Sequence, residues 1–437
     1  MKTKGSREKR INVITLGCSK NIVDSENLIT QLRHNQYAVT HDAEDAAEIV
    51  IINTCGFIDV AKEESIDTIL EYAKHKEEGR VDKLYVTGCL SQRYRGELAL
   101  EIPEVDAWFG TLELPSLLHI LNADYKHELI GERSITTPSH YAYLKISEGC
   151  NRTCAFCAIP LMRGVHISRS IESLQKEAAH LASHGVKELI LIAQELTYYG
   201  LDNYKRRALP DLLNALADVD GIEWIRLHYA YPHKFPLEVI QVMAERSRIC
   251  KYLDMPLQHA DDTILNAMRR QITQRETKEL IGSIRGMVPD IALRTTFLVG
   301  FPGETEEQFD MLCNFVEEMR FDRVGVFEYS HEENTSGYLL KDDVPAEVKS
   351  ERANRLLEIQ RAISLEKNTA LVGKVRRVLF DRKEDQYFVG RTESDSPEVD
   401  NEVYVRAENS YGRIGDFASV KITDASEYDL FGELVHP

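Results

Sequence analysis

Short apolar runs alternate with longer amphipathic stretches in the first part of the chain. The pattern predicts buried strands over residues 11–16, 48–52 and 83–87, with helices at 25–34 and 62–74 between them. Helices that connect successive strands are typical of a parallel sheet covered by helices. We therefore predict an α/β domain with a parallel sheet at the start of the chain.

The same alternation continues through six further strand-like runs. They span residues 143–146, 188–192, 222–227, 251–254, 292–298 and 324–329. Helical periodicity follows nearly all of them, for example over 172–183, 237–245 and 306–319, and one long helix is predicted over 345–368. Six strand–helix units predict a partial (β/α)6 barrel, related to the eightfold one.

The last segment changes to short strands separated by turns. Runs at 374–380, 387–390, 402–405 and 418–422 predict a small, closed, antiparallel β-barrel. The sequence thus divides into three domains. They span residues 10–125, 136–370 and 371–437.

The chain is acidic and has no segment suited to a membrane. It has 437 residues, 43% of them apolar, and a formal net charge of −18, which does not favour nucleic acid as the main partner. We see no secretory leader and no run of about 20 apolar residues, so we expect a cytoplasmic protein. We also expect it to be a monomer. Eight cysteines in such a chain favour metal or catalytic roles over disulfides, with buried free thiols as the alternative.

Three cysteines lie in one loop after the first strand of the predicted partial barrel. Cys150, Cys154 and Cys157 are spaced closely enough to reach three irons of one cubane, which leaves the fourth iron open. Zinc or core packing are the alternatives, but structural zinc usually needs four ligands and the sequence has no second Cys-x-x-Cys pair. The loop therefore favours an iron–sulfur cluster.

This Cys-x3-Cys-x2-Cys loop, with the aromatic Phe156 before its last cysteine, resembles the signature of the radical S-adenosylmethionine (SAM) superfamily. The resemblance implies that the open iron binds the amino and carboxylate groups of SAM, which is then cleaved to a 5′-deoxyadenosyl radical. The cofactor carries such chemistry, while the protein positions and shields it. Phe156, Glu195 and Arg294 are the candidate cofactor contacts.

Other polar motifs follow the predicted strands, where the active sites of such barrels lie. Arg294 lies within a strand, so its charge needs either a carboxylate at the barrel mouth, such as that of SAM, or a salt bridge on the strand surface. His228 and His259 are better explained as hydrogen-bonding residues than as ligands. Residues 300–303 fit either a site motif or a turn before an acid-capped helix.

Three further cysteines are far apart in the sequence but occupy equivalent places. Cys18, Cys55 and Cys89 each lie just beyond a predicted strand of the first sheet. Because the carboxyl ends of parallel strands share one edge, we expect these thiols to converge. Cys250 and Cys313 lie in or near amphipathic helices and are predicted to be buried structural thiols.

A second set of three thiols before a radical SAM barrel resembles the methylthiotransferase family. Besides the three-cysteine loop, the similar stretches are residues 17–21, 24–26, 53–55, 87–89, 255–259, 296–305 and 390–392. The resemblance implies two 4Fe–4S clusters, a radical cluster on the loop cysteines and an auxiliary cluster on the cysteines of the first sheet. One SAM would methylate sulfur carried by the auxiliary cluster, and another would supply the radical that removes hydrogen from the substrate carbon.

The C-terminal barrel resembles the TRAM domain of these enzymes. Two residues depart from the family pattern: Glu195 stands where aspartate is usual, and Asn334 where glycine is usual. Both changes keep polarity, but the first weakens the assignment of Glu195 as a cofactor contact.

The family has a tRNA-modifying branch and a protein-modifying branch. Residues 17–21 and 395–400 resemble the branch that modifies an aspartate of ribosomal protein S12 in the small subunit. From residue 372 onward the chain has nine basic and fourteen acidic residues, which disfavours RNA and favours a basic ribosomal protein.

The expected reaction adds a methylthio group to the β-carbon of that aspartate, with flavodoxin or ferredoxin as an electron donor. Methylthiolation of isopentenyl-adenosine in tRNA is the alternative reaction. A zinc- or RNA-binding module without catalysis is the alternative from another class, since fold alone does not decide function.

Overall fold

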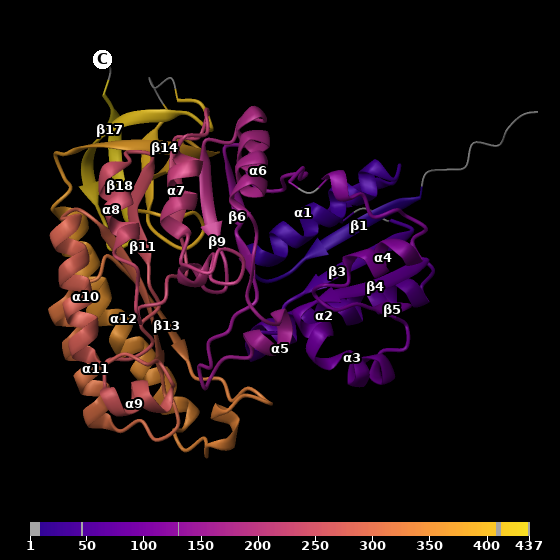
Figure 1. Ribbon diagram of the computed structural model, residues 1–437, viewed down its shortest axis with the longest axis horizontal. Coiled ribbons are helices and arrows are strands. Elements are labelled where there is room, and N and C mark those ends of the chain that lie inside the picture. The colour runs from indigo at the N-terminus through magenta and orange to yellow at the C-terminus, as the bar shows by residue number, and fades with distance from the viewer. Residues whose placement is uncertain (1–8, 45–46, 130, 408–411, 436–437) are drawn as a thin grey trace, which may run out of the picture.

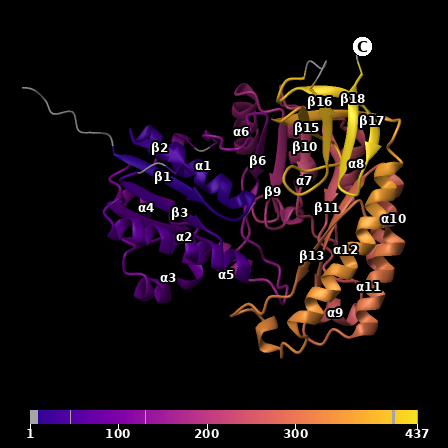
Figure 2. The same ribbon diagram turned by 180° about the vertical axis from the view of Figure 1, so that it is seen from behind.

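The computed structural model describes residues 9–44, 47–129, 131–407 and 412–435. It shows an N-terminal α/β unit beside a larger central sheet, with a small barrel packed against one end of that sheet (Figures 1 and 2). Residues 436–437, the end of the predicted third domain, and residues 1–8, which precede the first, lie outside the described residues.

The N-terminal unit is a five-stranded parallel sheet in the order β2-β1-β3-β4-β5. Its strands are β1 (Arg10–Thr15), β2 (Ala38–His41), β3 (Ile49–Thr54), β4 (Lys83–Gly88) and β5 (Ala107–Trp108). Its helices are α1 (Ser19–His34), α2 (Asp59–Glu77), α3 (Cys89–Glu101), α4 (Leu114–Ile120) and the 3-10 helix η1 (His127–Leu129). The prediction missed the edge strands β2 and β5, which are short and only partly buried.

The alternation along β3 explains why this sheet has two covered faces. Ile49 and Ile51 pack in one hydrophobic cluster, while Val50 and Ile52 pack in another on the opposite face. All six positions of β3 are buried, as expected for the central strand of a parallel sheet.

The central unit is an open, six-stranded parallel sheet in the order β13-β12-β11-β10-β9-β6. Its strands are β6 (Tyr141–Lys145), β9 (Glu188–Ile192), β10 (Trp224–Leu227), β11 (Ile249–Asp254), β12 (Ala292–Val299) and β13 (Arg323–Glu328). The short strands β7 (Ser147–Glu148) and β8 (Ile167–Ser168) form a separate antiparallel pair. The expected partial barrel with six strands is confirmed.

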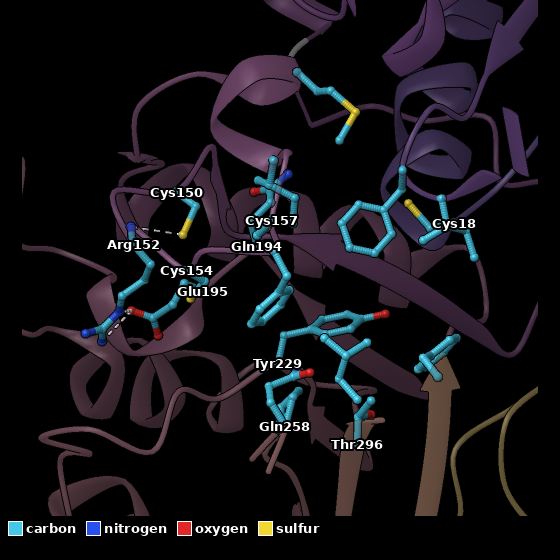
Figure 3. A pocket seen from close by; sticks show the side chains of 18 of the residues that line it. Cys18, Cys150, Arg152, Cys154, Cys157, Gln194, Glu195, Tyr229, Gln258 and Thr296 are labelled. Carbon is cyan, nitrogen blue, oxygen red and sulfur yellow. Dashed lines mark hydrogen bonds and ion pairs between the residues drawn. The ribbon is translucent and has the colours of Figure 1, made fainter. Parts of the chain in front are cut away.

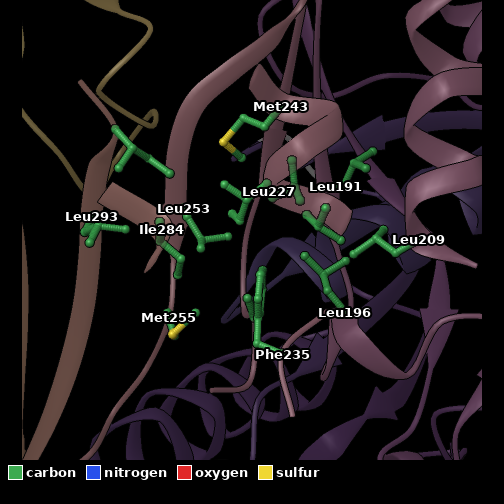
Figure 4. Close-up of a cluster of buried hydrophobic side chains, with 14 of the residues drawn as sticks. Leu191, Leu196, Leu209, Leu227, Phe235, Met243, Leu253, Met255, Ile284 and Leu293 are labelled. Carbon is green, nitrogen blue, oxygen red and sulfur yellow. The ribbon is translucent and has the colours of Figure 1, made fainter. Parts of the chain in front are cut away.

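Helices cover one face of the central sheet. They are α6 (Ile171–Ser183), α7 (Leu209–Ala217), α8 (Glu238–Glu245), α10 (Gln274–Met287), α11 (Glu306–Met319) and α12 (Ala346–Thr369). Leu191, Leu227, Leu253 and Leu293 project from successive strands into the largest hydrophobic core under these helices (Figure 4). The short helix α5 (Ile159–Arg163) packs against α3 of the N-terminal unit instead. The short α9 (Asp262–Ala267) and the 3-10 helices η2 (Leu196–Tyr198) and η3 (Gly337–Leu339) belong to the connections after β11, β9 and β13. None of the described helices is long and apolar enough to cross a membrane.

The C-terminal unit is a closed barrel in the order β14-β15-β16-β18-β17. Its strands are β14 (Val375–Glu384), β15 (Tyr387–Thr392), β16 (Glu402–Arg406), β17 (Phe417–Ala425) and β18 (Asp429–Leu434). The expected antiparallel pairing holds except between β16 and β18, which pair in parallel. A closed ring with an odd number of strands cannot alternate direction throughout, so one parallel pair is unavoidable once β18, which the prediction missed, joins the barrel.

Candidate active site

The three thiols of the N-terminal sheet converge at its carboxyl edge. Cys18 immediately precedes α1, Cys55 follows β3 and Cys89 opens α3. All three line the same cavity. Burial, together with the neighbouring thiols of Cys18 and Cys89, raises the pKa of Cys55 to about 11. The predicted convergence is therefore present in the fold.

Asn21, in the first turns of α1, ties together the loops that carry these thiols. Its Nδ2 donates a hydrogen bond to the carbonyl oxygen of Thr54 at 3.0 Å, and its Oδ1 lies 4.0 Å from Sγ of Cys89. Gly17 has φ +88°, and a Cβ at that position would lie 2.6 Å from Cβ of Cys55. Only glycine permits this close approach of two thiol-bearing loops.

The loop with Cys150, Cys154 and Cys157 follows β7 at the carboxyl end of the central sheet. The backbone N–H of Arg152 donates to Sγ of Cys150 at 3.4 Å, and Nη1 of Arg270 donates to Sγ of Cys154 at 3.4 Å. Burial raises the pKa of Cys150 to about 11 and that of Cys157 to about 12. Buried thiols with such values ionise readily only beside a strong positive charge such as bound iron.

Both cysteine sets open into one cavity of about 480 Å³ between the two sheets. Figure 3 shows the loop cysteines on one side of this cavity and Cys18 on the other. Apolar side chains such as Phe156, Met162 and Leu298 line much of the remaining wall. The cavity is therefore bordered by two separate thiol groups and largely shielded by apolar residues.

Glu195 lines this cavity as part of a buried ion pair. Its carboxylate lies 3.0 Å from Nη2 of Arg152. The guanidinium of Arg152 lies 3.9 Å from the ring centroid of Tyr198 and 3.8 Å from that of Tyr231. Glu195 and Phe156 are thus both at the cavity wall, where the sequence placed them, and their contact with a cofactor remains a prediction.

Arg294 lies elsewhere and already has partners. Its Nη1 lies 3.1 Å from Asp254, and its Nε lies 3.3 Å from Asp400 of the C-terminal barrel. It is not among the described residues that line the cavity. The geometry therefore favours the salt-bridge interpretation of Arg294, and a contact with SAM gains no support from this arrangement.

His228, His259 and the Gly-Phe-Pro-Gly turn at residues 300–303 make contacts that stabilise the fold. Nε2 of His228 lies 2.8 Å from Oγ of Ser396, and burial holds the pKa of His228 well below its ordinary value. Nε2 of His259 lies 3.5 Å from the carboxylate of Glu304. The residue after Glu304, Thr305, caps α11 in a reciprocal capping box. The turn interpretation of residues 300–303 therefore agrees with the structure.

Two cysteines stand apart from the cavity. Cys250 is fully buried beside Trp224 and Tyr252, and Cys313 is buried in the largest core. Cys250 lies in strand β11 rather than near a helix, but its burial agrees with the expected structural role.

Sequence reasoning did not identify the cations of the cavity as site residues; they are Lys20, Arg152, Arg163 and Arg270. Lys20 and Arg152 each lie two residues from a ligand-candidate cysteine, and this proximity was the available signal. Arg163 and Arg270 come from segments without a recognisable motif, so only the fold reveals them.

The donor sets suit iron–sulfur chemistry. Among the described residues, no group of three or more His, Cys, Asp or Glu side chains is placed to hold a single metal ion. A cubane distributes its thiolates over separate irons, so it accepts thiols that are spaced more widely than one ion allows. Each set here offers three thiols, the ligand type that iron–sulfur clusters prefer.

Family models match each part of the chain. Residues 10–110 match the uncharacterized protein family UPF0004, residues 144–316 the radical SAM superfamily and residues 372–435 the TRAM domain. The fold and the site define a radical SAM enzyme, a class that uses an iron–sulfur cluster and SAM. Similar solved structures include the radical SAM methyltransferase TsrM from Kitasatospora setae, with a TM-score of 0.55 and 14% identity over 73% of each chain. At that identity the likeness concerns the fold alone.

Relatives of known name cover the whole chain. A protein of Cytophaga hutchinsonii is 61% identical over 100% of both chains, and one of Flavobacterium johnsoniae is 60% identical over 99% of this chain and 100% of its own. A protein of Bacteroides fragilis is 53% identical over 98% of this chain and 100% of its own. Each is named ribosomal protein uS12 methylthiotransferase RimO. This chain belongs to that family of radical SAM methylthiotransferases.

Proposed function

We propose that this protein transfers a methylthio group to the β-carbon of an aspartate of ribosomal protein uS12. The observation that carries the proposal is the placement of two independent three-thiol sets on the wall of a single cavity. Two such sets match a reaction in which one centre generates a radical and the other holds the incoming sulfur. The names of the full-length relatives support uS12 as the substrate.

The proposed ligands follow the two sets. Cys150, Cys154 and Cys157 would hold the radical cluster, with Phe156 and Glu195 beside the bound SAM. Cys18, Cys55 and Cys89 would hold a second 4Fe–4S cluster. When bound, these groups supply a 5′-deoxyadenosyl radical and a transferable sulfur.

The chain's own residues fix the distance between the two sets. Asp24 of α1 and Glu148 of β7 each pair with both Arg163 and Lys145. Arg163 and Lys145 belong to the central unit, whereas Asp24 belongs to the N-terminal unit. A partly buried network of two anions and two cations holds its members in one geometry. This network would therefore keep the two thiol sets at a fixed separation across the cavity.

The C-terminal barrel favours a protein substrate over tRNA. Its excess of acidic residues would raise the rate of encounter with a basic ribosomal protein and repel RNA phosphates. Part of that charge is used internally, because Asp395 pairs with Arg323 and Asp400 with Arg294. Methylthiolation of tRNA is therefore the alternative outcome of the test.

We further propose that the protein acts in the cytoplasm as a monomer, with a flavodoxin or ferredoxin as electron donor. The test is an anaerobic reaction of the reconstituted enzyme with uS12 and, separately, with isopentenylated tRNA at low and physiological salt. Mass spectrometry should show one hydrogen of uS12 replaced by a methylthio group. Modification of the tRNA but not of uS12 would refute the proposal.

A further inference from the structure

Lys20 is a buried cation at the edge of the cavity. It is the second residue of α1, two positions after Cys18, and its side chain lines the cavity. Only 8% of the residue is exposed. Its ammonium nitrogen lies 3.2 Å from the ring centroid of Tyr229, which follows β10 in the central unit. Lys20 therefore spans the boundary between the two sheets.

No carboxylate of the described residues pairs with the ammonium group of Lys20. In the described part of the chain, no hydrogen bond or ion pair involves its ammonium group; its contact is the face of Tyr229. The first turn of α1 also contains no acidic residue. A helix N-terminus carries partial positive charge, so a buried lysine there is unfavourable unless an anion binds beside it.

The other cations of the cavity differ from Lys20. Arg152 is paired with Glu195, and Arg163 with Asp24. Arg270 donates to Sγ of Cys154 and therefore lies on the side of the cavity that carries the three-cysteine loop. Lys20 is thus the cation on the auxiliary side whose charge the described residues leave without an anionic partner.

We propose that the ammonium group of Lys20 binds the side-chain carboxylate of the substrate aspartate. This inference rests on the proposed function and names the residue that selects its substrate. The carboxyl carbon of aspartate is bonded directly to the β-carbon that is to be modified. A carboxylate held by Lys20, near Cys18, therefore keeps that β-carbon between the two thiol sets.

The same contact explains selection for an acidic side chain. Asparagine has nearly the shape of aspartate but no charge, so it would leave the ammonium group uncompensated. The ring of Tyr229 fits this role because it offers a cation a weak attraction without neutralising it. The charge thus remains available to an incoming anion.

The test compares Lys20→Met, Lys20→Arg and the control Lys176→Met in the full-length reconstituted enzyme. Lys176 is an exposed residue of α6, and the described residues give it no ion pair, so its variant removes one charge away from the cavity. The measured quantities are the Kd and KM for uS12 and for uS12 with asparagine in place of the target aspartate. Iron content, the reduction potentials of the clusters and the KM for SAM are measured in parallel.

The wild type and Lys176→Met should bind the aspartate form about 30-fold or more tightly than the asparagine form, because truncating a buried charge pair is costly. Lys20→Met should bring that ratio close to one, and Lys20→Arg should retain part of it. Iron content and the KM for SAM should stay unchanged.

Three results would overturn the inference. If Lys20→Met still prefers the aspartate form of uS12 over the asparagine form by the wild-type ratio, Lys20 does not bind the carboxylate. A raised KM for SAM with an unchanged ratio would assign the ammonium group to the carboxylate of SAM. Loss of iron or a shifted potential with an unchanged ratio would assign it to the auxiliary cluster. If the wild type does not modify uS12 at all, the proposed function fails and this inference with it.

Discussion

The guanidinium of Arg93 lies 2.7 Å from the carboxylate of Glu332, and both side chains are 3% exposed. Arg93 belongs to α3 of the N-terminal unit, while Glu332 follows β13 of the central unit. Arg93 also donates to the backbone carbonyl oxygen of Gly56, next to Cys55. The pair thus joins one wall of the cavity to the other.

Arg93→Met should loosen this boundary. Glu332 keeps a second cation, Lys62, at 3.1 Å, so the loss should be about 1–3 kcal/mol rather than the larger cost of a fully unpaired charge. Hydrogen–deuterium exchange should rise at residues 55–57 and 330–335. Arg275→Met, which removes an exposed pair with Glu279, is the control and should change stability by less than about 1 kcal/mol. Equal hydrogen–deuterium exchange at these residues in Arg93→Met and Arg275→Met would show that Arg93 does not hold the two units together.

Single cysteine variants should separate the two proposed clusters. Cys154→Ala should lose about half of the iron and all cleavage of SAM, whereas Cys55→Ala should lose about half of the iron yet still form 5′-deoxyadenosine. The measurements are iron analysis and chromatography of the nucleoside products under anaerobic conditions. Full iron retention in either variant would refute the corresponding ligand assignment.

Cys250→Ala and Cys313→Ala should keep all of the iron and nearly all activity. Each removes a buried sulfur from an apolar cluster, so the expected effect is a loss of stability of about 1 kcal/mol. The corresponding serine variants should lose more, because they bury a hydroxyl group without an assured partner. Loss of a cluster in either alanine variant would mean that the proposed ligand sets are wrong.

The buried His228 should make stability depend on pH. Its pKa in the folded protein is held well below the ordinary value, first by burial and then by Arg226 and other cations. The unfolded chain therefore binds more protons below about pH 6.5, and stability should fall as the pH is lowered through that value. Thermal unfolding of the cluster-free protein between pH 8 and about pH 5.5 measures this slope.

His228→Gln should reduce the dependence of stability on pH by the contribution of one histidine, while the glutamine keeps a polar partner for Ser396. Equal slopes in the wild type and His228→Gln would show that another group controls the acid response.

Much of the fold and of the thiol geometry was predictable because parallel sheets impose it. Once β1, β3 and β4 are read as neighbouring parallel strands, Cys18, Cys55 and Cys89 must meet at one edge. The spacing of the loop cysteines likewise needs no tertiary information. These predictions depend only on local pattern and on the handedness and direction of strands.

Contacts between distant segments were not predictable in this way. One of the two partners of Arg294 is Asp400, which lies in another domain, and no periodicity in either segment points to the other. In the sequence, residues 395–400 are evidence for the protein-modifying branch. In the structure, Asp395 and Asp400 form ion pairs that hold the barrel on the central sheet. Lys20 was visible within a motif, but its missing anionic partner is a property of the folded cavity.

The buried charges between the barrel and the central sheet limit which truncations and domain exchanges this enzyme can tolerate. Glu188 accepts from Arg226 of the central sheet and from Arg391 of the barrel, and all three side chains are almost fully inaccessible. A chain cut before residue 371 would expose Arg226 and leave Glu188 with half of its partners. Chimeras that exchange this barrel between relatives should therefore fold only when the matching charges of the central sheet are exchanged with it.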